Sequence, residues 1–357
     1  MLGTHRLITD THCEVYDLVK QYADGIFWDL TKHDIVPDAV YMIGRQQFDQ
    51  NIELIRNLVQ HQKIIPVYSN PAEGSETIVR QLKRLRINES VTNGDILVLS
   101  GGDMESKYKH MVYDSFLVKV LNYQENINAS QTNIIKHNKP YKFLFLNGRA
   151  RSHRQWLLER WHSTVLPHCL WTNLDTAQGP IQFLPAKYEI PQFQKNTNLV
   201  GQGFIKPALF ENTWGDVIIN TACYEDTYCS IVSETVFDYP YSFRTEKIAK
   251  PIAVGHPWIA VANYGFYRDM RELGFRTFSP YIDESFDLIE DNKTRLSRIS
   301  DIVEDMVANC DFDQLMYDTK AICEYNKAHL IKLRSKIQAG FESTLLEFLD
   351  NYDRFRI

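Results

Sequence analysis

The densest group of charged side chains that could bind a ligand lies within residues 230–270. Two apolar, strand-like runs at 229–232 and 257–262 flank a polar insert and a short helix. In an α/β chain, charged groups that gather where a strand ends and a helix begins lie at the open end of a sheet, where ligands bind. A solvated helix start with ordinary ion pairs is the alternative interpretation. The segment supplies Glu234, Arg244, Thr245, Glu246, Lys247 and Lys250.

These residue types suit the binding of a nucleotide with its phosphates. A carboxylate at a helix start, such as Glu246, can accept hydrogen bonds from ribose hydroxyls. Arg244, Lys247 and Lys250 can neutralise phosphate charge. The alternative is mutual pairing of Glu246 with Lys250 on an exposed helix, which contributes only about 0.3–0.5 kcal/mol.

A second candidate is the run Asn147-Gly-Arg149-Ala-Arg151-Ser-His-Arg154, which follows a predicted strand and opens a helix. A helix start offers unpaired N–H groups and the positive end of the helix dipole, and arginine binds phosphate through two parallel hydrogen bonds. The spacing of a Walker loop is absent. Three solvated arginines in a turn are the alternative. The run therefore predicts an anion site at a strand-to-helix turn.

The first half of the chain offers carboxylates in two loops that follow predicted strands. Glu73 lies in the loop 69–76, and Asp103 follows two glycines at 101–102. Each is a candidate general base for an acceptor hydroxyl, because both loops are expected at the same end of a sheet. A helix cap or a turn is the alternative role for either carboxylate.

Motifs for other chemistries are absent. No His or Cys spacing is typical of a metal site, and neither Gly-x-Ser-x-Gly nor His-Glu-x-x-His occurs. The acidic run at 283–287 is interpreted as a turn and helix start, with metal binding as the alternative. His256 is interpreted as structural, with a place in the ligand site as the alternative. We therefore expect neither a metal nor a cofactor.

The elements that position these residues alternate between strands and helices. This βαβα order predicts an α/β fold with mainly parallel sheets covered on both faces. An Asn-rich stretch at 124–140 is expected to be a linker, and 176–211 a long loop or lid. The expected domains are 1–140, 141–285 and 286–357, the last formed by helices. Strands are expected at 39–43, 63–68, 95–100, 141–146, 170–172, 217–223, 228–232 and 258–261, and helices at 46–60, 75–85, 113–121, 152–166, 245–255, 267–273, 288–309 and 312–352.

The composition excludes several classes of protein. The chain has 357 residues, of which 44% are hydrophobic, so it can bury a full core, and no apolar run is long enough for a transmembrane helix. Six scattered cysteines without a CxxC pair and an N-terminus without a signal-peptide pattern predict a cytoplasmic protein. A net charge of −6 disfavours nonspecific binding to bulk nucleic acid.

Two segments resemble the C-terminal half of the α1,3-fucosyltransferase family, and they stand in the same order. Residues 146–157 (LNGRARSHRQWL) are similar to the strand, Asn-containing loop, arginines and helix that open the family's nucleotide domain. Residues 232–257, with Thr-Glu-Lys at 245–247, are similar to its strand, acidic loop, helix and following glycine. The resemblance covers roughly residues 141–285.

The resemblance implies a GT-B glycosyltransferase with two Rossmann-like domains and a nucleotide-sugar donor bound mainly by the second. It implies that Glu246 holds the ribose and that Arg154 and Lys250 neutralise the diphosphate without a metal. The expected reaction moves a sugar to an acceptor hydroxyl of a glycan, a protein or a modified DNA base. Two alternatives remain. One is a noncatalytic protein that binds a phosphate ligand or a partner on the same fold, and the other is a DNA-base glycosyltransferase.

Overall fold

The computed structural model describes residues 6–61, 63–84, 96–105, 109–188, 193–195, 207–209, 213–214 and 218–350. The chain divides into two compact units. The first unit comprises residues 1–115 and 333–357, and the second unit comprises residues 116–332. Each unit has its own parallel sheet, so the predicted α/β class is confirmed.

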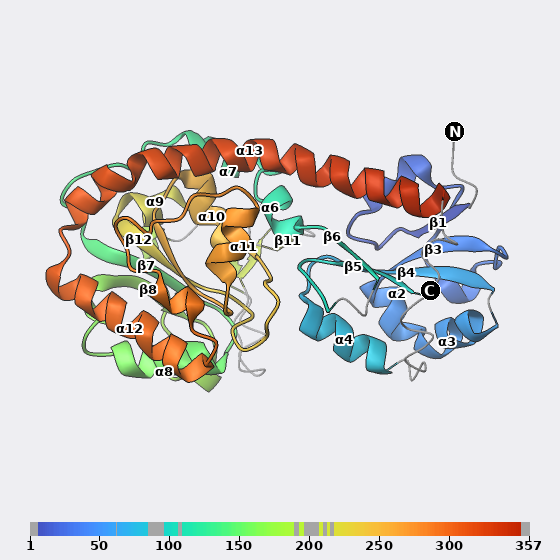
Figure 1. Ribbon diagram of the computed structural model, residues 1–357, viewed down its shortest axis with the longest axis horizontal. Coiled ribbons are helices and arrows are strands. Elements are labelled where there is room, and N and C mark those ends of the chain that lie inside the picture. Colours follow the sequence, from blue (N-terminus) through green and yellow to red (C-terminus); the bar gives the residue numbers. More distant parts are fainter. Residues whose placement is uncertain are drawn as a thin grey trace. The chain divides into compact units, whose positions relative to one another are not determined.

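The first unit is built on a six-stranded sheet in the order β2-β1-β3-β4-β5-β6 (Figure 1), in which every neighbouring pair is parallel. The chain passes from β1 to β2 on one side and then to β3 on the other side of β1. The sheet therefore has a topological switch point between β1 and β3, and ligands of open α/β sheets bind at the carboxyl ends of such strands. The strands are β1 Leu7–Asp10, β2 Gly25–Phe27, β3 Ala39–Gly44, β4 Ile64–Asn70, β5 Leu97–Ser100 and β6 His110–Val112.

Helices cover both faces of this first sheet. On one face, Phe48, Ile55 and Ile78 from three successive helices pack in a core with Tyr41 and Tyr68 of the strands. The last part of the C-terminal helix lies on the opposite face (Figure 1). The helices are α1 Tyr16–Val19, α2 Arg45–Gln50, α3 Ile52–Gln60, α4 Ser75–Arg84 and α13 Phe312–Asp350.

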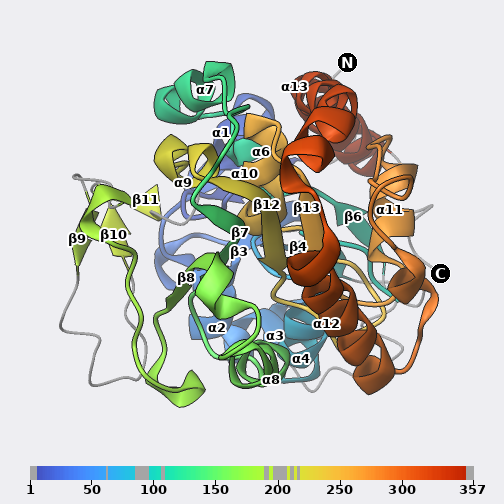
Figure 2. The ribbon, with the colours of Figure 1, turned by 90° about the vertical axis from the view of Figure 1, so that its left-hand side faces the viewer.

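The second unit has a four-stranded parallel sheet in the order β13-β12-β7-β8. From β7 the chain passes to β8 on one side and later to β12 on the other, which places a switch point between β7 and β12. Helices α8 and α12 cover one face, and α9 and α10 cover the other (Figures 1 and 2). The strands are β7 Tyr141–Asn147, β8 Cys169–Asn173, β12 Thr227–Ser233 and β13 Trp258–Val261.

Trp161 shows how the helices of the second unit are anchored. Its ring lies 5.3 Å from that of Phe145 on β7, and its Nε1 donates to Ser300 Oγ of α12 at 2.7 Å. A small antiparallel sheet of β9 Phe193–Lys195, β10 Pro207–Leu209 and β11 Thr213–Trp214 completes the unit. The helices are α6 Ser115–Lys119, α7 Gln124–Gln131, α8 Ser152–Trp161, α9 Thr221–Glu225, α10 Glu246–Val254, α11 Phe266–Glu272 and α12 Asn292–Asn309.

Most of the predicted strands and helices are confirmed, including the helix expected at 245–255. Gly255 caps this helix, α10, in the left-handed region, with φ of 76°. Pro251 lies inside α10. None of the helices within the described residues has the combination of length and apolar character that crossing a membrane requires.

One predicted helix and one predicted linker are wrong in detail. The helix expected at 46–60 is broken at Asn51, whose Nδ2 donates to the backbone oxygen of Gln47 at 3.0 Å and so competes with the helical ladder. The linker expected at 124–140 begins with α7, because buried Asn126 satisfies its amide with the Val120 oxygen and the Ile219 N–H.

Three other expectations also need correction. Part of the strand expected at 217–223 is the start of α9, since the Asn220 side chain accepts from the Ala222 N–H and caps a helix. The loop expected at 176–211 contains β9 and β10, and much of the remainder lies outside the described residues. Strands β1 and β2 were not predicted. The expected domain limit at 140 differs from the division at 115, since residues 116–140 belong to the second unit. The helices expected as a third domain at 286–357 are divided between the second unit, up to residue 332, and the first unit, from residue 333.

Candidate functional site

The strongest candidate site lies at the carboxyl ends of β7 and β12 in the second unit. These two strands flank the switch point, and each leads into a helix through a loop that carries predicted site residues. Helices α8 and α10 both begin at this edge, because each connects parallel strands. The first N–H groups of a helix have no partner within it, and together with the helix dipole they favour an anion.

Asn147 is the buried polar group at the centre of this edge. It ends β7 and is 1% exposed. Its backbone pairs with Thr172, but neither its Oδ1 nor its Nδ2 has a hydrogen-bond partner within the described part of the chain. Buried side-chain amides nearly always have hydrogen-bond partners, so an amide without one indicates a position where a ligand or a water molecule binds. Asn147, expected in the turn after the strand, is the last residue of β7, and its amide is free to bind a group at the edge of the sheet.

Arg154 is buried within the protein and donates its hydrogen bonds there. Its Nη2 donates to the backbone oxygens of Ser233 at 2.7 Å and Glu234 at 3.0 Å, and its Nη1 donates to that of Arg149 at 2.9 Å. Its Nε donates to Ser233 Oγ at 3.3 Å. Burial lowers the pKa of its guanidinium to about 10, with a smaller contribution from Arg151. Arg154 thus joins the loops after β7 and β12, whereas Arg149 is exposed.

Glu234 and Thr245 join the end of β12 to the start of α10. The fully buried Glu234 carboxylate accepts the Thr245 N–H at 3.1 Å and the Thr245 hydroxyl at 2.6 Å. Thr245 Oγ1 accepts in turn from the Lys247 N–H at 3.3 Å, as an N-cap does. Burial raises the pKa of Glu234 despite the nearby Lys247. Both residues therefore hold the loop that precedes α10.

Glu246 and Lys247 form the charged part of the site. Burial alone would raise the pKa of Glu246, but Lys247 and Lys250 together lower it, so the carboxylate is ionised. Lys247 Nζ lies 2.5 Å from Glu246 Oε1, and their side chains are 22% and 11% exposed. Arg244, the remaining predicted residue, is buried immediately before Thr245. The structure therefore gathers the residues of both predicted motifs at one sheet edge.

The two histidines nearest these motifs are structural. His256 is buried, with its Nδ1 2.9 Å from Ser230 Oγ and its Nε2 2.8 Å from the backbone oxygen of Thr227. Burial lowers its pKa to about 3. His153 stacks on Phe237 and contacts the backbone oxygen of Glu234, and burial likewise lowers its pKa to about 3. The structural interpretation of His256 agrees with these contacts.

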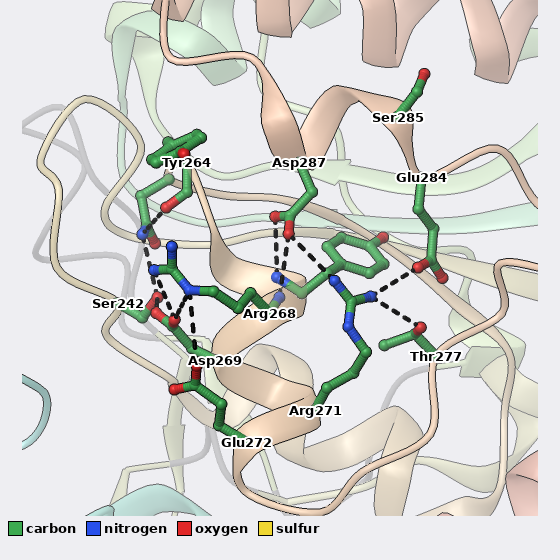
Figure 3. Close-up of polar contacts among 12 residues, drawn as sticks. Ser242, Tyr264, Arg268, Asp269, Arg271, Glu272, Thr277, Glu284, Ser285 and Asp287 are labelled. Carbon is green, nitrogen blue, oxygen red and sulfur yellow. Dashed lines mark hydrogen bonds and ion pairs between the residues drawn. The ribbon is translucent and has the colours of Figure 1, made fainter.

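The acidic run 283–287 contacts α11, and Figure 3 shows Asp287 and Glu284 beside Arg271 of that helix. Asp287 accepts the N–H groups of Tyr267 at 2.9 Å and Arg268 at 3.0 Å at the start of α11. Arg271 bridges Asp287 and Glu284, at 3.7 and 3.1 Å. The run enters the short 3-10 helix Ser285–Leu288, and its carboxylates contact α11, whereas the helix expected from 288 begins at Asn292. Within the described residues, no group of three or more His, Cys, Asp or Glu side chains could hold a metal.

In the first unit, the predicted carboxylates lie on loops at the carboxyl end of the sheet. Glu73 follows β4 and pairs with Arg45 at 2.7 Å, and Asp103 follows β5 and is exposed. The sequence interpretation missed a third group at this edge, formed by Asp10 at the end of β1 and His12 two residues later. Asp10 Oδ1 and His12 Nδ1 lie 3.1 Å apart. The Asp-x-His spacing after an apolar run was the only available signal for it.

Comparison of the chain with protein-family models and with curated proteins gives no match.

Proposed function

We propose that this protein is a glycosyltransferase that binds a nucleotide-diphosphate sugar at the carboxyl edge of β7 and β12 in the second unit. One observation carries the proposal. At this switch point, the unsatisfied amide of Asn147 lies at an edge where α8 and α10 both begin, beside the half-buried Lys247 and the Glu246 carboxylate, whose side chain is 11% exposed. A diphosphate is bound by N–H donors and cations, and ribose hydroxyls are bound by a carboxylate. This edge of the sheet has all three kinds of group.

The proposal assigns different roles to the exposed and the buried side chains. Glu246 accepts hydrogen bonds from the ribose hydroxyls, because its carboxylate is ionised and partly accessible. Arg149, Lys247 and Lys250 neutralise the diphosphate, and this charge stabilises the leaving group as the glycosidic bond to phosphate breaks. Arg154, Glu234 and Thr245 position the loops rather than contact the donor, which changes the role that the resemblance implied for Arg154.

Basic side chains are proposed to take the place of a metal at the diphosphate. Donor binding should therefore persist in EDTA and gain little from Mg²⁺. A donor that binds only with Mg²⁺ would contradict this part of the proposal.

The first test is a thermal-shift panel of UDP, GDP, CDP and ADP and their common sugars. A ligand at about a hundred times its dissociation constant adds about 2.7 kcal/mol of stability, which is readily seen. Glu246→Gln should then raise the dissociation constant of the nucleotide by about 10- to 100-fold, as measured by calorimetry. A hydrogen bond to a charged group contributes about 1.5–3 kcal/mol. Glu159→Gln, on the exposed side of α8, is the matched control.

The outcomes separate the proposal from its alternatives. Binding of one nucleotide with transfer of its sugar supports the transferase. If a nucleotide binds but its sugar is neither transferred nor slowly hydrolysed, the noncatalytic phosphate-binding alternative is favoured. Transfer that requires duplex DNA with a modified base would identify the DNA-base glycosyltransferase. No binding by any member of the panel would refute the proposed function.

A further inference from the structure

The carboxyl edge of the first sheet holds a second group of polar residues, at the switch point between β1 and β3. The register places Thr9 beside Met42, so Asp10 and the loop after it lie next to the end of β3 at Gly44. Gly44 pairs with Ser69 at the end of β4. The loop after β1 also reaches β4 directly, because Cys13 Sγ donates to Ser69 Oγ at 3.0 Å. His12 is thus at the place in this sheet where an open α/β fold binds its ligand.

Asp10 orients the imidazole of His12. The Asp10 side chain is 0% exposed, and its oxygens accept the backbone N–H groups of His12 at 2.9 Å and Gly44 at 3.1 Å. Because this carboxylate acts as an acceptor, the Nδ1 of His12, 3.1 Å away, carries the proton in their contact. The Nε2 atom is then the basic nitrogen, on a side chain that is 43% exposed.

The absence of a side chain at Gly44 leaves room for this arrangement. A β-carbon there would lie 3.0 Å from Asp10 Oδ2 and 3.1 Å from the backbone oxygen of His12. Both distances are tighter than most real contacts of a β-carbon, so the neighbouring atoms would have to shift slightly. A side chain at this position would therefore push the Asp10–His12 pair away from the end of β3.

Two more groups on this edge have unsatisfied polar atoms. Asn70 ends β4 and Ser75 begins α4, and they are 1% and 3% exposed. Asn70 Oδ1 and Ser75 Oγ have no hydrogen-bond partner within the described residues. Such atoms suit a ligand rich in hydroxyl groups, which can donate and accept at each oxygen.

We infer that the Asp10–His12 pair is a general base for a substrate hydroxyl bound at this edge of the first sheet. In the proton transfer, the O–H bond of the substrate breaks, a bond forms between the proton and His12 Nε2, and the oxygen keeps the electron pair. Asp10 is the positioning residue, since it fixes the tautomer and stabilises the imidazolium that forms. That the hydroxyl belongs to a glycosyl acceptor rests on the proposed function. His12 is preferred to Glu73 as the base because Arg45 already pairs with the Glu73 carboxylate.

The tautomer of His12 can be measured without any substrate. In the full-length protein, ¹⁵N-detected imidazole correlations at mildly alkaline pH should show His12 with its proton on Nδ1. Asp10→Asn should reduce that preference. A proton on Nε2 in the unmodified protein would overturn the inference, whatever the activity.

The base role is measured with the sugar nucleotide that the thermal-shift panel identifies and with p-nitrophenyl glycosides as hydroxyl probes. His12→Ala should lower kcat by about 10²- to 10⁴-fold, the usual contribution of a general base. The dissociation constant for the nucleoside diphosphate should not change. Added imidazole should restore part of the lost rate, which it could not do for a residue with only a structural role. His61→Ala, at an exposed histidine of the same unit, is the control.

A kcat for His12→Ala equal to that of the control would overturn the inference. Absence of nucleotide binding in the unmodified protein would count against the proposed function instead. The two failures are distinguishable, because nucleotide binding and the His12 tautomer are measured separately.

Discussion

Replacement of Arg154 tests whether its buried guanidinium holds the candidate site together. In Arg154→Met, the backbone oxygens of Arg149, Ser233 and Glu234 each lose a donor. The Glu234 oxygen keeps its contact with His153 Nε2 at 3.1 Å, so two oxygens are left without this donor. A buried polar group left unsatisfied costs about 1–3 kcal/mol, and two of them predict a loss of about 2–6 kcal/mol in the free energy of unfolding. That is a large part of the 5–15 kcal/mol or so that stabilises a typical domain.

Two further variants separate charge from geometry. Arg154→Lys keeps the positive charge but cannot span the same acceptors, so it should recover less than half of the loss. Arg149→Met removes an exposed arginine whose backbone oxygen still accepts from Arg154. Its effect on stability should be within about 0.5 kcal/mol, whereas nucleotide binding should weaken.

Urea denaturation followed by tryptophan fluorescence is the suitable assay, because Trp161 lies in the same helix as Arg154. Far-ultraviolet circular dichroism should give the same midpoint if the second unit unfolds in a single transition. An Arg154→Met protein with the stability of the wild type and no nucleotide binding would refute the reasoning. It would show that Arg154 contacts the donor, as the resemblance implied.

Three other perturbations have expected outcomes. Thr245→Val should lower the free energy of unfolding by about 1–2 kcal/mol, because α10 loses its N-cap and Glu234 loses a donor, and Thr245→Ser is the control in the same urea assay. Gly255→Ala should cost about 1 kcal/mol in thermal denaturation, since its φ of 76° strains any other residue, and a raised melting temperature would contradict this. Burial lowers the pKa of His153 and His256 from 6.5 to about 3, so the unfolded chain binds protons more readily between these values. Stability should therefore fall as the pH drops through that window, by up to about 1.4 kcal/mol per pH unit for each imidazole, and His256→Gln should make the slope shallower.

The parallel sheets could be predicted because their strands are continuous apolar runs that end at polar or turn-forming residues. Residues 64–70 and 227–233 are buried at every position, as expected for strands covered on both faces. Because each of the loops at 147–154 and 234–245 follows such a strand, both are expected at the carboxyl edge of a parallel sheet. Local sequence patterns were sufficient for these conclusions, since strand, loop and helix follow one another in the chain.

Features that depend on distant partners could not be predicted. The polar helix α7 is stabilised by Asn126, whose partner Ile219 lies 93 residues away. The role of Arg154 depends on the backbone of residues 233 and 234, which no spacing around the arginine reveals. The pairing of Asp10 with His12 becomes informative only when β1 and β3 are known to be neighbours. In each case the tertiary partner, rather than the residue type, determines the role.

The long C-terminal helix has a consequence for the order in which the chain folds during synthesis. The second unit is one continuous segment, whereas the first unit needs residues 333–350, where Phe341 and Leu345 are buried and Phe341 contacts Tyr113. Although residues 1–115 leave the ribosome first, their sheet lacks this cover until the whole of α13 has emerged. We expect the second unit to complete its fold first, and a chain stopped after residue 332 to expose the apolar face that α13 covers, which would make it a chaperone substrate.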